Sequence, residues 1–259
     1  AQYFPSPFQS ALSAPCVAAG ADLISGGTKP FYTFAMSLAG APNVGDALAN
    51  LKRYVFEERR LTLAQVKAAL DADFAGYEDV QALLLHGPKF GNADPYVDAI
   101  VNQVLSFVSD VTAETPAFHG ARSTVAAAAV TANIGLGMCL GATPDGRKAG
   151  EPISEGGISP AQGTNTSGAT ATMLSVAGLD HTKLRHGEVL NMRMSPAAVE
   201  GEDKLRKFAQ LIRTYVKLGG FLVQFNIVST ETLRDAQAHP ERHRDLVVRV
   251  ATYAAYFVE

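Results

Sequence analysis

A short apolar run between two helical segments constrains the fold of this chain most. Residues 221–228 read Phe-Leu-Val-Gln-Phe-Asn-Ile-Val, which has the length and composition of a strand. Residues 203–217 before it have helical spacing and end at a Gly-Gly pair, and Ser229 after it opens a helix that Pro240 ends. Strands that alternate with helices predict an α/β architecture. The side chains expected to point inward from 203–217 are Leu205, Phe208, Leu211, Ile212 and Tyr215.

The remaining segments extend this alternation. Thr62 is a plausible N-cap, and Asp94-Pro95 has the form of a cap followed by proline at the first helical position. Small and β-branched residues at 125–134 predict a buried strand. The expected helices are 44–58, 63–74 and 95–111, whereas 1–43 is expected to be packed loop with one short helix and 135–170 an extended, loop-rich stretch.

Composition excludes several classes of protein. The 259 residues are 47% hydrophobic and 18% charged, which fits a globular chain with a sizeable core. A net charge of -3 gives no electrostatic footprint for nucleic acid. No apolar run reaches the roughly 20 residues needed to span a bilayer, and the N-terminus does not read as a signal peptide. Cys16 and Cys139 do not form a disulfide framework, so a reducing cytoplasm is expected and both thiols are predicted to be buried.

Other chemical motifs are weak. His239 and His243 have the spacing of a zinc helix, but Pro240 stands between them where that motif needs glutamate, so a solvated pair at a helix end is expected. The glycines at 135–146 lack the Gly-Lys-Ser/Thr of a phosphate loop. Ser159 and Ser175 have no nucleophile-elbow context, and no cluster of Cys and His predicts a metal site.

Several ordered motifs carry a family resemblance. Arg249-Val250-Ala251-Thr252-Tyr253 resembles the radical motif Arg-(Val/Ile)-(Ser/Ala/Cys)-Gly-Tyr of the glycyl radical enzymes, the pyruvate formate-lyase superfamily. The resemblance covers about 12–259 and is closer to the dehydratase, decarboxylase and lyase branch. The other matching segments are Ser25-Gly26-Gly27-Thr28-Lys29, 44–58 with Val55-Phe56-Glu57-Glu58, Pro88-Lys89-Phe90-Gly91-Asn92-Ala93-Asp94, 141–149 (Gly-Ala-Thr-Pro-Asp-Gly-Arg-Lys-Ala), Gly156-Gly157-Ile158-Ser159-Pro160, Val223-Gln224-Phe225-Asn226 and 231–237.

The resemblance implies a fold and a division of the chain. The family fold is a ten-stranded α/β barrel of two five-strand halves, and this chain would be mostly the second half with its surrounding helices. Residues 1–140 would belong to the barrel domain and 141–259 to a glycine radical domain truncated at its C-terminus. Because a half barrel leaves sheet edges open, the chain alone is expected to be unstable or oligomeric. The Asp145-Gly146-Arg147 segment would form a turn near the barrel mouth, with Arg147 able to pair with a carboxylate.

The resemblance also implies a chemistry and identifies its main departure. In the family, an S-adenosylmethionine/iron-sulfur activase removes hydrogen from the motif's glycine, and a thiyl radical then acts on a small-molecule substrate. Thr252 occupies the position of that glycine, and the Gly-Cys-x-Glu motif of the catalytic cysteine occurs nowhere in the chain. A planar α-carbon radical needs a residue without a Cβ, and threonine adds a stiff branched side chain. The chain is therefore expected to be a C-terminal piece that is inactive as given.

The remaining expectations concern the site and its partners. The loop neighbours of Thr252 are Arg249, Val250, Ala251 and Tyr253, and an ordinary strand or turn is the alternative interpretation of this motif. One wall of the substrate pocket is expected at Val130, Thr131, Ala132, Asn133 and Ile134, with a plain buried strand as an equal alternative. No bound cofactor is expected; the resemblance implies the activase as a partner and an intact homodimer in anaerobic metabolism, without nucleic acid or membrane. The other hypothesis is a non-catalytic subunit that docks on an intact barrel partner or an activase.

Overall fold

The structure is a computed structural model that describes residues 5–28, 33–116, 122–128, 131–250 and 253–258. Helices and short strands alternate along it, as the sequence predicts for an α/β chain. The helices are α1 Pro7–Ala11, α2 Ala14–Ala19, α3 Ala41–Leu51, α4 Leu63–Asp71, α5 Glu78–Leu85, α6 Pro95–Glu114, α7 Ala132–Met138, α8 Gly168–Ala177, α9 Glu202–Lys217 and α10 Thr230–Ala238. The strands are β1 Thr33–Ser37, β2 Arg122–Ala126, β3 Leu190–Met194, β4 Val223–Ile227, β5 Val247–Val250 and β6 Tyr253–Tyr256.

The described strands form three pairs. β1 and β2 are parallel, β3 and β4 are parallel, and β5 and β6 form an antiparallel hairpin in which Val250 pairs with Tyr253. An isolated bridge from Ala127 to Glu188 connects the end of β2 with the residues before β3, and a second bridge, from Gly157 to Val189, adds the segment around Gly157 to the same region. The parallel pairs therefore belong to one continuous framework.

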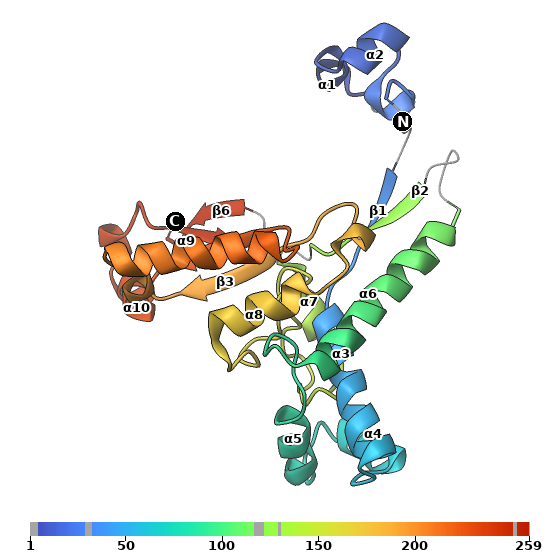
Figure 1. Ribbon diagram of the computed structural model, residues 1–259, viewed down its shortest axis with the longest axis vertical. Coiled ribbons are helices and arrows are strands. Elements are labelled where there is room, and N and C mark those ends of the chain that lie inside the picture. Colours follow the sequence, from blue (N-terminus) through green and yellow to red (C-terminus); the bar gives the residue numbers. More distant parts are fainter. Residues whose placement is uncertain (1–4, 29–32, 117–121, 129–130, 251–252, 259) are drawn as a thin grey trace.

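Helices bury one face of this framework. The long helix α6 packs against α3 and β2, and its side chains Val97, Val101 and Leu105 are fully or almost fully buried. The same core includes residues of α8 and β3 and the buried Tyr215 of α9. A second, smaller core lies between α4 and α5 around Phe74 and Leu84. Figure 1 shows α4 and α5 at one end of the molecule and α1 and α2 beyond the opposite end of β1.

Caps fix several helix ends where the sequence predicts them. Thr62 and Gln65 form a reciprocal capping box at α4, and the Asp94 carboxylate accepts from the Tyr96 amide ahead of α6. Ser229 accepts from the Thr232 amide at 3.0 Å, which confirms the predicted start of α10. The helix predicted at 44–58 begins earlier and continues beyond α3 as a single π-helical stretch, Lys52–Glu57. Short 3₁₀ turns occupy Leu23–Ser25, His181–Lys183, Pro196–Ala198 and Pro240–Arg242.

Some predictions from the sequence are wrong in detail. The strand predicted at 125–134 ends at Ala126, because β2 loses its partner where β1 ends at Ser37, and α7 begins at Ala132. The first 43 residues contain two short helices and β1 where one short helix was expected. Leu205 on α9, Cys139 after α7 and Ile134 of the predicted strand were all expected to be buried and are exposed. Cys16 is buried, as predicted.

Within the described residues, the helices are all too short or too polar to cross a membrane.

Candidate active site

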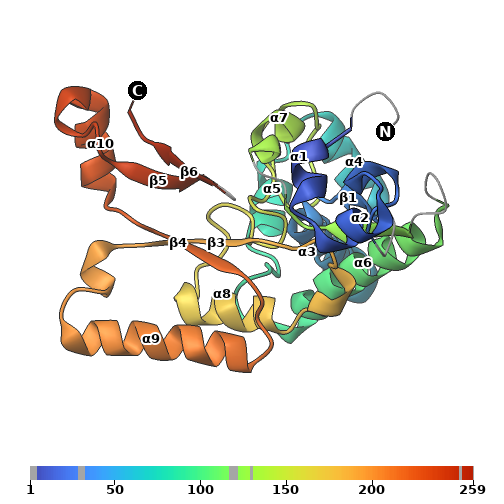
Figure 2. The ribbon, with the colours of Figure 1, turned by 90° about the horizontal axis from the view of Figure 1, so that it is seen from above.

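Strand β4 has two faces with different partners. Val223 and Phe225 pack toward α9, where the rings of Phe225 and Phe208 meet edge to face with centroids 4.8 Å apart. Because side chains alternate along a strand, Gln224 and Asn226 point to the opposite face. Figure 2 shows β3 and β4 between α9 on one side and the β5–β6 hairpin on the other.

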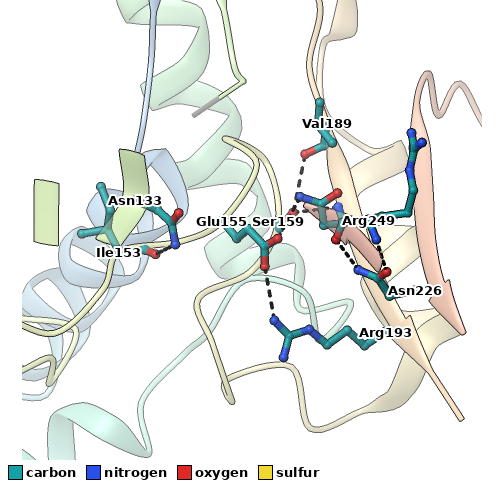
Figure 3. Close-up of polar contacts among 9 residues, drawn as sticks. Asn133, Ile153, Glu155, Ser159, Val189, Arg193, Asn226 and Arg249 are labelled. Carbon is teal, nitrogen blue, oxygen red and sulfur yellow. Dashed lines mark hydrogen bonds and ion pairs between the residues drawn. The ribbon is translucent and has the colours of Figure 1, made fainter. Parts of the chain in front are cut away.

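The polar face of β4 holds the hairpin through Arg249. The Asn226 side-chain amide donates to the Arg249 carbonyl oxygen at 2.7 Å, and its own oxygen accepts from the Arg249 amide at 2.7 Å. The Arg249 Nε donates to the Gln224 side-chain oxygen at 3.0 Å. The first residue of the predicted radical motif is thus anchored to β4, as Figure 3 shows for Asn226.

A cavity of about 670 Å³ opens beside this contact. Its wall combines the hairpin, β4, the start of α10, the end of β3 and the start of α7. Charged side chains of both signs line it: Arg193, Arg249, Glu155 and Glu231. Hydrogen bonds from its own amide and from the Ser229 hydroxyl lower the pKa of Glu231, so this carboxylate is ionised at neutral pH. A cavity of this size fits a small polar ligand.

Glu155 is held in place at the cavity wall. Its carboxylate accepts from the Asn191 side-chain amide at 3.2 Å and lies 3.8 Å from the Arg193 guanidinium (Figure 3). The Arg193 side chain is 79% exposed, so this ion pair contributes little to stability. Its position in the cavity wall leaves the guanidinium free to meet an anionic or polar ligand.

The Gly156–Pro160 segment is hydrogen-bonded to the start of β3 next to the cavity wall. The Ser159 hydroxyl accepts from the Asn191 amide at 2.9 Å and donates to the Val189 carbonyl at 3.5 Å. The Ser175 hydroxyl accepts from the Ala93 amide at 2.9 Å. Both serines therefore join loops to strands and helices, which agrees with the absence of a nucleophile motif around them.

The sequence-predicted site residues fall into two groups. Thr131, Asn133, Ile134 and Arg249 line the cavity together, although 115 positions or more separate Arg249 from the others. Asn133 is buried, with its side-chain amide 3.4 Å from the Ile153 carbonyl. Ala132 lies in α7 and Tyr253 begins β6, and neither lines the cavity, whereas Val250 is the last residue of β5. Val130, Ala251 and Thr252 lie outside the described residues.

Sequence reasoning missed the roles of Glu155, Arg193 and Asn226 at the cavity. The alternation of apolar and polar residues in Val223-Gln224-Phe225-Asn226 is the signal that could have identified Asn226. Glu155 and Arg193 carry no comparable local signal, since only the pairing of β3 with β4 brings Arg193 opposite Asn226.

Two further sequence interpretations can be compared with the structure. The sequence suggests that Arg147 is able to pair with a carboxylate; its guanidinium donates to the carbonyl oxygens of Gly141, Lys148 and Glu151 and forms no ion pair among the described residues. His243 contacts the Asp235 carboxylate at 2.7 Å near the end of α10. No group of three or more His, Cys, Asp or Glu that could hold a metal occurs among the residues that the structure describes.

Comparisons with known proteins agree with the motifs. Residues 1–137 match the family described as pyruvate formate lyase-like, and residues 154–258 match the family described as glycine radical. Trans-4-hydroxy-L-proline dehydratase of Clostridioides difficile is 35% identical over 258 residues, which cover 99% of this chain and 32% of the relative. Isethionate sulfite-lyase of Desulfovibrio desulfuricans is 38% identical, over 100% of this chain and 32% of the relative.

A solved structure gives the same picture. The glycerol-bound form of the B12-independent glycerol dehydratase from Clostridium butyricum superimposes with a TM-score of 0.92 at 36% identity, over 98% of this chain and 32% of that one. The chain thus spans about a third of the length of the relatives that it matches.

Proposed function

Because the chain belongs to the glycyl radical enzyme superfamily, as its C-terminal portion, we propose that it supplies the radical loop and one wall of the substrate pocket of a dehydratase or lyase. One observation supports this most. Arg249 of the radical motif lines the same cavity as Thr131, Asn133 and Ile134, which the sequence predicts as pocket residues. The substrate is a small polar molecule that loses water or another leaving group.

The chain as given does not carry the radical. The hydrogen that an activase would remove belongs to a glycine, and position 252 is a threonine. A branched Cβ opposes a planar α-carbon, and overpacking at a tight site typically costs about 1–3 kcal/mol. The larger consequence is chemical, because no stored radical means no thiyl radical and no attack on substrate.

The two parallel strand pairs would be part of a ten-stranded barrel, with the remaining strands on sequence that this chain does not include. The exposed surface supports this proposal. It measures 14870 Å², whereas a folded monomer of 27.3 kDa has about 10,900 Å². Large apolar side chains such as Phe8, Phe107 and Phe221 are more than two-thirds exposed, as expected of a face that further barrel elements cover.

The test is radical formation after repair of position 252. The Thr252→Gly chain and the unchanged chain are each incubated without oxygen with an S-adenosylmethionine radical activase, and electron paramagnetic resonance is recorded. We expect an organic radical in the glycine variant and none in the unchanged chain. Thr252→Ala serves as the control, since it removes the branched side chain but keeps a Cβ. A signal of equal size in all three chains would contradict the proposal, as would silence of the glycine variant with an activase that works on its own enzyme.

A second candidate function is that of a non-catalytic subunit, and Thr252 together with the exposed apolar surface favours it. Such a subunit would dock on an intact barrel partner by taking the place of the corresponding half of its barrel. Analytical ultracentrifugation of the chain with a full-length relative tests this. A 1:1 complex would support the subunit, and independent sedimentation at micromolar concentrations would exclude it.

A further inference from the structure

The β5–β6 hairpin is attached to the framework at very few points. Among the described residues, its hydrogen bonds to β4 all involve Arg249, twice as donor and once as acceptor. Val247, Tyr253 and Tyr256 are each about half exposed or more, so these three side chains add little apolar packing. A two-stranded hairpin alone is marginally stable in water. The hairpin therefore depends on its attachment to β4 both for its place and for its order.

Asn226 makes this attachment in a way that few side chains can. An asparagine amide presents a donor and an acceptor in one plane, like a peptide group. Here both bond to the same residue, the carbonyl and the amide of Arg249, each at 2.7 Å. A single hydrogen bond would let β5 rotate about that bond, whereas two parallel bonds fix the rotation of β5 as well as its distance from β4.

The strand that carries the amide is itself rigidly held. On its opposite face Phe225 contacts Phe208 of α9, and the buried Tyr215 anchors that helix in the core. β4 also pairs with β3 along its full length. A contact made from this strand can thus fix the hairpin relative to the core.

We propose that Asn226 is a positioning residue: a two-point clamp that fixes the β5–β6 hairpin against β4, with Gln224 orienting the Arg249 side chain. This inference deepens the proposed function and rests on it, because β5 and β6 carry Arg249 and Tyr253 of the proposed radical motif. The clamp acts through the backbone of Arg249 and touches no reacting atom.

The experiment is hydrogen exchange of the chain itself, with backbone amides in β5 and β6 followed by NMR or mass spectrometry. Asn226→Asp keeps the size of the side chain and the acceptor for the Arg249 amide. In this variant a second carboxylate oxygen replaces the amide donor that binds the Arg249 carbonyl. We expect hairpin protection at pH 7 to fall about 10- to 100-fold, from one lost hydrogen bond and one unpaired acceptor.

Gln224→Glu is the matched control. It adds the same charge two residues away on the same face of β4, but it strengthens the contact with the Arg249 Nε. Its hairpin protection should be unchanged or higher. Equal losses in both variants would show a general charge effect and overturn the clamp.

A pH series separates positioning from simple support. The carboxyl group that Asn226→Asp introduces again offers one donor and one acceptor once it is protonated, so protection relative to the unchanged chain should return as the pH falls through the pKa of that carboxyl. The unchanged chain in the same buffers corrects for the other charged groups of the cavity, Glu155, Arg193, Glu231 and Arg249. Protection that stays low at acidic pH would overturn the proposal.

Protection in α6 reports global folding in every sample. If Asn226→Asp lowers it, Asn226→Ala removes both bonds without a charge. Loss confined to the hairpin then supports the clamp, and loss across α6 as well, or no loss at all, refutes it. Because no radical, activase or substrate is involved, this result is independent of the test at position 252.

Discussion

Gly157 offers the sharpest test of how the candidate site is held. It has φ +97° and forms a bridge with Val189, next to the bridge from Ala127 to Glu188 that joins β2 to the residues before β3. A Cβ at this position would lie 2.2 Å from the carbonyl carbon and oxygen of Ala127, which are backbone atoms that cannot rotate away. Gly187 provides a matched control, with φ +98° and nothing within 4 Å of its Cβ position.

The two alanine variants share one cost and differ in another. The left-handed backbone costs a residue with a Cβ about 1–2 kcal/mol, which applies to both Gly157→Ala and Gly187→Ala. The overlap with Ala127 adds about 1–3 kcal/mol of overpacking to Gly157→Ala alone. We therefore expect losses of about 1–2 kcal/mol for Gly187→Ala and about 2–5 kcal/mol for Gly157→Ala.

Urea unfolding followed by circular dichroism measures both free energies of unfolding. The difference between the variants, and not either value alone, carries the reasoning, since it cancels the backbone term. Losses equal to within about 0.5 kcal/mol would refute the argument, because that is the spread expected of sites without a special contact.

Three further outcomes are expected. Burial raises the pKa of Asp46 to about 8 from an unfolded value of 3.8, so the folded state keeps a proton that the unfolded chain loses. The free energy of unfolding should therefore fall as the pH rises from about 4 to about 8. Urea titrations across this range should show a flatter fall for Asp46→Asn. Thr62→Ala removes one half of the capping box with Gln65 and should cost about 1 kcal/mol in the same assay, whereas a loss below about 0.2 kcal/mol would mean that the cap contributes nothing. Cys139 should react with a thiol reagent in the folded chain and Cys16 only after urea is added, so rapid labelling of both thiols would contradict the burial of Cys16.

The helices were predictable where their ends depend on neighbouring residues. The caps at Thr62, Asp94 and Ser229 satisfy amides two or three positions away, so local sequence is enough to place them. The strand at 125–134 failed for the opposite reason. Its length depends on how far β1 runs alongside, and the small residues after Ala126 carry no local preference that would reveal this.

The candidate site shows the same division. The motif at 249–253 and the segment 130–134 were chosen from the sequence, and Arg249, Thr131, Asn133 and Ile134 line one cavity. Glu155 and Arg193 could be assigned to the site only from the tertiary structure, which places both in the cavity wall. The exposure of side chains also depended on the tertiary structure. Leu205 has the helical spacing of a core residue, but it is exposed to solvent on α9.

The sequence by itself determined the α/β alternation, the capped helices, the family and the threonine at position 252, because each follows from residue identity or from contacts within a few positions. The tertiary structure alone decided that Asn226 binds the backbone of Arg249 and that β3, β4, α7 and the hairpin enclose one cavity. These contacts join residues 23 positions apart or more, and parallel strand pairing and helix packing, not local preference, bring them together.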